Sequence, residues 1–246
     1  MSELNTQSLA QIVTLDHRAA AIFEKYHLDF CCKGKRSLQQ ACVEQKLSVD
    51  DITVELENIL QKDPGNNKNS FEFLSLSQLV DYIVSIHHDY VKKEMPQIMA
   101  YLQRVASKHG DRHPEMFKVF ELFVEVKEEM EMHMQKEELI LFPRIKELEK
   151  LFQSNYARMQ PDIAYLQSPI TVMEHEHDHA GNLLNEIRIL TSDYTAPADA
   201  CTTYRLSFAA LKAFEIDLHQ HVHLENNILF PKALAIFSQQ MNTSLN

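Results

Sequence analysis

Two segments of this chain are near copies of each other. Residues 133–143 read HMQKEELILFP and residues 221–231 read HVHLENNILFP, so both follow the pattern H-x-x-x-E-x-x-I-L-F-P. A His and a Glu four residues apart lie on one face of a helix, about one turn from each other. An imidazole and a carboxylate placed in this way can hold one transition-metal ion. The pattern therefore predicts metal ligands on two helices.

The duplication extends towards the N-terminus. A His-Asp pair lies 45 residues before the first motif and another lies 44 residues before the second. The chain thus repeats a hairpin in which the first helix carries one His and the second carries His-x-x-x-Glu. Two such hairpins form a four-helix bundle with four His and two Glu inside, which suits a two-iron centre with bridging carboxylates. The predicted metal ligands are His88, His133, Glu137, His177, His221 and Glu225.

Composition favours an all-α protein and excludes several classes of partner. The 246 residues include only four Gly and eight Pro, and long runs are rich in Leu, Glu, Lys and Met. The net charge of -11 argues against a nucleic-acid partner. Neither a signal-peptide pattern nor an apolar run of membrane-spanning length is present, so we expect a cytoplasmic protein with no membrane partner. The four Cys are expected to be reduced thiols.

The chain is predicted to contain two domains. Residues 1–62 form a small helical domain, residues 63–70 a polar linker rich in Asn, and residues 71–246 the four-helix bundle. In the small domain one amphipathic helix is expected from Leu9 to Phe23. Two further helices follow, capped by Ser37 and Ser48.

Proline residues mark features of the four long helices. Pro96 predicts a kink or a short break in the first of them. The second is expected to begin near Pro114, and the third at Ser168-Pro169.

Helical periodicity chooses between neighbouring histidines. The chain contains His at 175, 177 and 179 and again at 219, 221 and 223. Residues two apart on a helix point roughly 200° apart, so three such histidines cannot converge on one ion. Only the middle His of each cluster falls on the apolar stripe. We therefore expect the outer four to face solvent or the edge of a neighbouring helix. On the first bundle helix, His87 remains an alternative to His88.

Two acidic residues stand one turn before a predicted ligand. Glu129 precedes His133 and Asp217 precedes His221, each by four residues. Each carboxylate could accept the second N–H of the ligand imidazole, or could be an exposed acid. The ligand set contains no Cys and suits iron, with manganese or a mixed site as alternatives. Positions would remain for a bridging oxo or hydroxo group and for O₂, NO or peroxide.

A pair of adjacent cysteines is the second chemical feature. A disulfide between Cys31 and Cys32 would close a strained ring, so a pair of thiols is expected. Such a pair could transfer electrons, accept a nitrosyl group or hold iron transiently, or it could be incidental. Cys42 and Cys201 are interpreted as structural.

The combination of motifs resembles a known family. Asp29-Phe-Cys31-Cys32-x-Gly34 in a short helical domain, followed by the two H-x-x-x-E-x-x-I-L-F-P segments, resembles the iron–sulfur cluster repair di-iron proteins, the Repair of Iron Centers family. Segments around residues 172–181 and 224–227 are also similar to that family. The resemblance implies a hemerythrin-like bundle whose two irons are held by the six predicted ligands, with a role for Cys31 and Cys32. Lys33 departs from the family pattern, where a small residue is commoner.

The resemblance implies repair of iron–sulfur clusters damaged by nitric oxide or oxidative stress, through iron donation, nitric oxide removal or both. Damaged iron–sulfur proteins would be the partners, and a homodimer is compatible with the sequence. The alternatives are a nitric oxide or peroxide reductase and a hemerythrin-like module that binds or senses O₂ or NO. The additional histidines 175, 179, 219 and 223 could form a weak outer metal site.

Overall fold

The computed structural model describes residues 3–61, 71–153 and 164–243. The first range forms a small helical unit, as predicted. After a 3₁₀ turn at Glu3–Thr6, its helices are α1 (Leu9–Leu15), α2 (Ala19–Lys25), α3 (Leu38–Gln45) and α4 (Val49–Gln61). The Ser37 hydroxyl accepts a hydrogen bond from the amide of Gln40, and the Ser48 hydroxyl accepts one from the amide of Asp51. These contacts confirm the two predicted caps.

The single helix predicted from Leu9 to Phe23 is wrong, because the chain breaks it into α1 and α2. Asp16 adopts an extended conformation after α1. Its carboxylate accepts the backbone N–H of Arg18 at 3.0 Å and also binds the Arg18 guanidinium. An Asp side chain that satisfies nearby backbone in this way competes with helix formation.

Gly34 allows the loop that carries the two cysteines to pack closely. A Cβ atom at this position would lie 2.1 Å from the carbonyl oxygen of Phe30. The Gly34 carbonyl also accepts the amide N–H of Ala10 at 2.9 Å, which ties the loop to α1. The glycine of the Cys-Cys-x-Gly segment is therefore required by close approach of the backbone.

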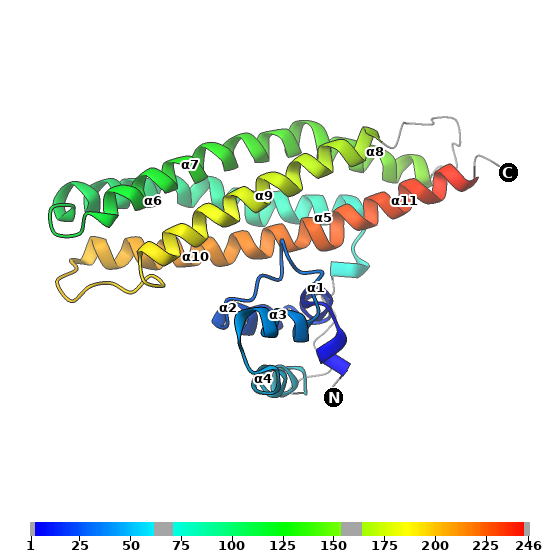
Figure 1. Cartoon of the computed structure of the whole chain (residues 1–246). Helices are drawn as coiled ribbons and strands as arrows, with labels where there is room; N and C mark the ends of the chain where they lie inside the picture. Colours follow the sequence, from blue (N-terminus) through cyan, green and yellow to red (C-terminus); the bar gives the residue numbers. More distant parts are fainter. Residues whose placement is uncertain (1–2, 62–70, 154–163, 244–246) are drawn as a thin grey trace.

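The other two ranges form four long antiparallel helices (Figure 1). The first and second consist of α5 (Leu76–Tyr82), the π-helical turn η4 (Ile83–His88) and α6 (Asp89–His109), then α7 (Glu115–Lys136), the π turn η5 (Glu137–Leu141) and α8 (Phe142–Gln153). The third and fourth are α9 (Ala164–Leu190), and α10 (Thr202–Leu224) with the π turn η6 (Glu225–Leu229) and α11 (Phe230–Thr243). A 3₁₀ turn at Phe71–Phe73 precedes α5. The predicted linker 63–70 lies outside the described residues.

Pro96 and Pro169 lie in the interior of helices α6 and α9. Helix α6 continues through Pro96 without a break. Helix α9 begins at least as early as Ala164, so the predicted start at Ser168-Pro169 is wrong. Pro169 has no N–H for the carbonyl of Tyr165, one turn earlier. The guanidinium of Arg144 donates to that carbonyl instead, at 2.8 Å.

The interior of the bundle contains two apolar clusters with polar side chains between them. One cluster includes Val91 and Leu218, and it is continuous with the core of the small unit. The other includes Leu79, Ile170 and Leu229. The predicted metal ligands lie between these clusters along the helices. Within the described ranges, no helix is both long and apolar enough to cross a membrane.

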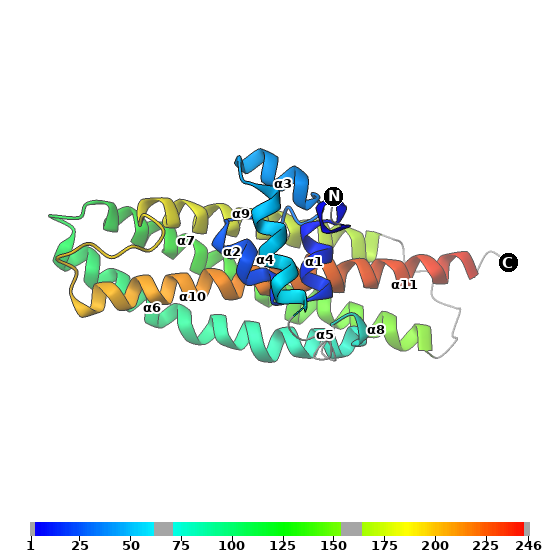
Figure 2. The ribbon, with the colours of Figure 1, turned by 90° about the horizontal axis from the view of Figure 1, so that it is seen from below.

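The small unit lies against one side of the bundle, beside α10 and α11 (Figures 1 and 2). The amide of Asn227 donates to the carbonyl of Cys31 at 2.9 Å. The ring of His219 lies 2.6 Å from the Glu24 carboxylate, and the ring of Phe30 packs edge-on against His223. The unit is thus attached directly beside the residues of the second motif.

Candidate metal centre

Three of the four bundle helices change from α to π geometry where they carry predicted ligands. His88 ends η4, whereas Glu137 begins η5 and Glu225 begins η6. In the last two turns the amides of Phe142 and Phe230 donate to the carbonyls of these glutamates, five residues earlier. Such π turns are frequent at functional sites. The sequence signal is the proline that ends each motif, which has no N–H to continue the regular ladder.

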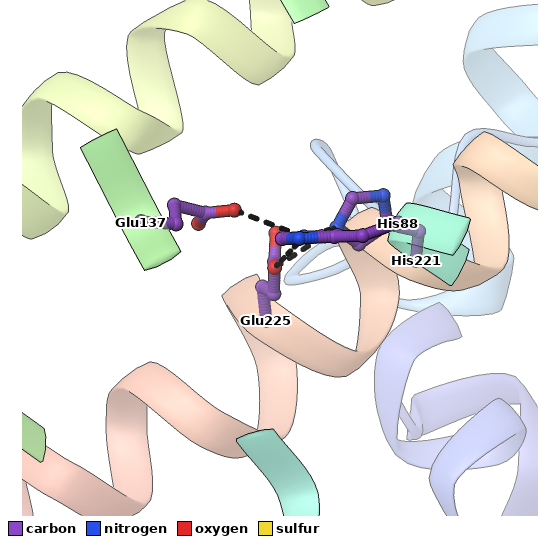
Figure 3. A group of neighbouring side chains, drawn as sticks. All are labelled: His88, Glu137, His221 and Glu225. Carbon is purple, nitrogen blue, oxygen red and sulfur yellow. Dashed lines mark hydrogen bonds and ion pairs between the residues drawn. The ribbon is translucent and has the colours of Figure 1, made fainter. Parts of the chain in front are cut away.

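The first group of side chains joins His88, Glu137, His221 and Glu225 (Figure 3). The Nε2 atoms of His88 and His221 lie 3.2 Å apart. His88 Nε2 is 3.3 Å from Glu137 Oε2, and His221 Nε2 is 2.9 Å from Glu225 Oε1. All four ligand atoms lie within 4.8 Å of one another and the side chains are fully buried, so the group can hold a metal ion.

The second group joins His133, Glu137, His177 and Glu225. The Nε2 atoms of His133 and His177 lie 3.0 Å apart. His133 Nε2 is 3.3 Å from Glu137 Oε2, and His177 Nε2 is 3.0 Å from Glu225 Oε2. Both carboxylates therefore belong to both groups. The structure brings all six predicted ligands together, with two histidines on either side of a shared pair of glutamates.

Several carboxylate oxygens of this cluster lack a hydrogen-bond partner in the part of the chain that the structure describes. Within the described ranges, neither oxygen of Glu137 receives a hydrogen bond of normal geometry, nor does Oε2 of Glu225. In each His–His contact two Nε2 atoms face each other, and at most one proton can lie between them. Buried donors arranged in this way are costly unless a cation is bound among them. The residues therefore fit metal ions in both groups.

Electrostatics within the cluster also favour cations. Burial lowers the pKa of His88, but Glu137 and Glu225 raise it to about 10. The pKa of His133 is likewise about 10, because Glu137 and Glu176 outweigh burial. Burial raises the pKa of Glu225, yet its histidine neighbours bring it well below its ordinary value. The carboxylates are thus ionised at neutral pH, and protons on the histidines would be displaced by a metal ion.

Polar groups around the cluster hold the outer nitrogens of three histidines. His88 Nδ1 lies 2.7 Å from Glu138 Oε1, and His133 Nδ1 lies 3.0 Å from Glu176 Oε2. His177 Nδ1 lies 2.9 Å from the amide oxygen of Asn226. Such contacts fix the orientation of ligand imidazoles and raise their basicity. His221 Nδ1 has no partner among the described residues.

The acids one turn before the ligands do not have the predicted contacts. Glu129 lies 3.1 Å from His179, and the Asp217 carboxylate lies 3.0 Å from His87 Nδ1. An imidazole that points Nε2 into the bundle directs Nδ1 towards a neighbouring helix, beyond the reach of an acid on its own helix. His87 is buried and stacks on the ring of His221, but it belongs to neither group, so the structure favours His88 over His87.

Not all of the outer histidines face solvent. His175 and His179 are exposed on α9. His223 is buried, with its Nε2 3.4 Å from the hydroxyl of Thr14, and His219 contacts Glu24. These last two face helices α2 and α1 of the small unit, so for them the predicted neighbouring helix belongs to the small unit. The sequence does not indicate these contacts of His219 and His223, because they depend on where the small unit docks.

The two adjacent cysteines are free thiols whose Sγ atoms lie 3.8 Å apart. Asp29 Oδ1 accepts the backbone N–H groups of Cys31, Cys32 and Lys33. Both cysteines and His177 line a cavity of about 320 Å³ between the small unit and the bundle. The two thiols and one candidate metal ligand, His177, therefore border the same pocket.

The remaining two cysteines differ from each other. Cys42 is buried, as expected of a structural residue. Cys201 is exposed, with Sγ 3.2 Å from His109 Nε2, so its interpretation as a structural cysteine is wrong. It lies just before the first residue of α10.

A helical bundle with a buried His and Glu cluster defines a class of metal-binding domain. Residues 79–233 match the family described as Hemerythrin HHE cation binding domain. Residues 5–60 match a second family, described as Domain of Unknown function (DUF542). The first match covers more than half of the chain, which places the bundle among the hemerythrin-type cation-binding domains.

Relatives over nearly the full length narrow this class. The chain is 35% identical over 229 residues to the iron-sulfur cluster repair protein YtfE of Enterobacter sp. (strain 638), covering 93% of this chain and 97% of that protein. It is 36% identical over 228 residues to the protein of that name from Musicola paradisiaca, with 93% and 96% covered. A probable iron-sulfur cluster repair protein of Haemophilus influenzae is 34% identical, with the same coverage. The chain belongs to this family of iron-sulfur cluster repair proteins.

Proposed function

We propose that the chain repairs iron–sulfur clusters damaged by nitric oxide or oxidative stress, using a di-iron centre. Damaged iron–sulfur proteins would be its partners, and the four free thiols agree with the expected cytoplasmic setting. The observation that carries the proposal is the sharing of Glu137 and Glu225 by two groups that each add two histidines. The proposed ligands are His88, His133, Glu137, His177, His221 and Glu225.

The chain would hold iron without thiolate ligands and would keep large molecules away from it. Each proposed ligand is at most 1% exposed, and Glu138, Glu176 and Asn226 orient three of the imidazoles. When bound, the two irons would supply ferrous iron for donation and redox chemistry for the removal of nitric oxide. Two histidines and two shared carboxylates hold each ion less tightly than a cage of thiolates would, which favours release to an acceptor.

Cys31 and Cys32 would receive what leaves the centre: iron, bound in exchange for a thiol proton, or NO⁺, which would replace a thiol proton while its electron would stay on the iron. The cavity that they share with His177 supports this role. Hydrogen bonding to Cys32 and burial raise the pKa of Cys31 well above its usual value, so Cys31 remains a protonated thiol at neutral pH. Cys32 is only partly buried and would be the first of the two to react.

Iron transfer tests this proposal. Reduced, iron-loaded protein is mixed with an apo iron–sulfur protein, and transfer is compared with leakage of iron into buffer. We expect transfer to exceed leakage, and the double variant Cys31→Ala/Cys32→Ala to keep its iron while transfer falls to the leakage rate. If the unaltered protein transfers iron no faster than it leaks, the donor role is wrong. If the double variant transfers normally, the thiols have no part in repair.

A nitric oxide or peroxide reductase is the second candidate, because a centre this enclosed admits small molecules only. Multiple-turnover assays with an electron donor distinguish it from repair. Sustained consumption of nitric oxide or peroxide at a rate that accounts for protection would favour the reductase. A module that only binds or senses its ligand would instead keep its full effect after loss of both cysteines.

A further inference from the structure

One histidine outside the central cluster faces two carboxylates on a neighbouring helix. His179 lies on α9, and Glu125 and Glu129 lie one turn apart on α7. His179 Nε2 is 3.1 Å from Glu129 Oε1 and 3.7 Å from Glu125 Oε1. One nitrogen and two oxygen atoms thus lie within 4.8 Å of one another at the surface. None of the three side chains belongs to the centre described above.

Glu125 and Glu129 lie in an arrangement that is unfavourable unless a cation is bound between them. Like charges four residues apart on a helix destabilise it. Within the described ranges, Glu129 Oε2 is buried and has no hydrogen-bond partner. Burial, followed by the charges of Glu125 and Glu176, raises the pKa of Glu129, although His179 opposes this. A single imidazole therefore leaves one buried carboxylate oxygen without a partner.

The duplication of the hairpin does not account for this cluster. In the second hairpin Ala213 stands where the first has Glu125, and Tyr90 corresponds to His179 in the paired helix. Only Glu129 has an acidic counterpart, Asp217, which contacts His87. The three donors are therefore a feature of the α7–α9 contact alone, with no equivalent across the bundle.

We propose that His179, Glu125 and Glu129 bind a divalent first-row metal ion such as Fe²⁺ or Zn²⁺, at a surface site separate from the central cluster. One imidazole and two carboxylates are the mixed donors that such ions accept. A cation at this point neutralises both acids and gives the buried Glu129 oxygen a partner. His179 and Glu125 are about half exposed, so water completes the coordination and the ion exchanges freely with solvent.

Calorimetric titration of iron-loaded protein with Zn²⁺ tests the site, with iron content measured before and after. The unaltered protein should bind one zinc ion at this site. In His179→Ala and Glu129→Gln the affinity for that ion should fall at least about tenfold, since loss of even an outer partner of a metal ligand costs roughly that much. Glu131→Gln is the matched control, because Glu131 lies on the same helix and pairs with Lys127. It should bind zinc normally.

The site is absent if iron-loaded protein takes up no zinc, or if the His179 and Glu129 variants bind it as the unaltered protein does. Zinc uptake matched by loss of iron also overturns the proposal, because the ion would then occupy the central cluster. Circular dichroism of each variant excludes unfolding as the cause of weaker binding. Repair activity does not enter this test, so its result is independent of the proposed function.

Discussion

Two carboxylates, Glu137 and Glu225, are shared by the two groups of candidate ligands. Glu225 presents Oε1 to His221 and Oε2 to His177, while Oε2 of Glu137 contacts both His88 and His133. Each histidine, in contrast, belongs to one group only. Loss of a glutamate should therefore affect both metal positions, and loss of a histidine should affect one directly.

This difference predicts the iron content of single variants. Glu225→Gln removes the charge and one oxygen donor from both groups, so its iron should fall to a small fraction of the about two ions per chain expected of such centres. His133→Ala should lose less, because His88, His221 and both carboxylates remain. Elemental analysis of freshly purified protein measures the outcome, with circular dichroism as the check on folding. Equal iron loss in the two variants would contradict the shared role of Glu225.

The sequence predicts the inward-facing residues better than their outer partners. Helical periodicity and the repeated motif identify all six clustered side chains, since the spacing that places an apolar residue inside also places a ligand there. Glu129, on the same helix, was one possible partner of His133 from the sequence, but the partner is Glu176 on α9. A contact between helices depends on how one helix is rotated against its neighbour, and a local pattern contains no such information.

At the scale of helices, a buried acid fixes the start of the first bundle helix. Glu149 on α8 accepts the amide N–H groups of Leu76 and Ser77 at 2.8 and 3.0 Å. Burial raises the pKa of this carboxyl, but the hydrogen bonds from Ser77 and Leu76 outweigh it and bring the pKa below its ordinary value. The charge at the start of α5 is therefore expected to stabilise the fold.

Glu149→Gln should lower the free energy of unfolding by about 1–2 kcal/mol, since the amide group keeps one acceptor but loses the charge. This difference in the free energy of unfolding should be largest above pH 4.5, the ordinary pKa of the carboxyl. It should disappear as the pH falls through the lower pKa of the folded state. Urea unfolding at several pH values measures it. Glu147→Gln, at an exposed position on the same helix, is the control and should change little. A pH-independent difference would contradict the assigned charge.

Helix boundaries were predicted well where a cap determines them and poorly where tertiary contacts do. Ser37 and Ser48 begin their helices as expected, because a hydroxyl acts on its own backbone. The start of α9 was missed because the Arg144 guanidinium, from another helix, occupies the carbonyl that Pro169 leaves free. The π turns were missed as well, since the spacing of apolar residues does not distinguish one irregular turn inside a long helix.

For the whole molecule, a difference between the two copies of the motif helps to explain why the small unit docks beside the second copy. Asn227 donates to the carbonyl of Cys31, whereas its counterpart in the first motif, Leu139, is 68% exposed. Asn227→Leu should lower the free energy of local opening of the cysteine loop by about 1 kcal/mol. Amide exchange in residues 28–34 should then be roughly fivefold faster. Hydrogen exchange monitored by mass spectrometry measures this, and Leu139→Asn is the matched control. Similar exchange in all three proteins would show that Asn227 does not hold the loop.

The charge balance of the molecule links metal binding to pH. In the metal-free fold His88 and His133 have pKa values of about 10, above the ordinary 6.5, so their protons stabilise that fold fully below pH 6.5 and progressively less as the pH rises towards 10. Bound metal replaces these protons, and its stabilising effect should therefore grow across the same interval. The gap in Tm between zinc-loaded and metal-free protein should widen from pH 6.5 to 9. Calorimetry in buffers of different ionisation heat should show release of roughly two protons on metal binding at pH 7.5. A constant gap without proton release would mean that the metal does not bind at these histidines.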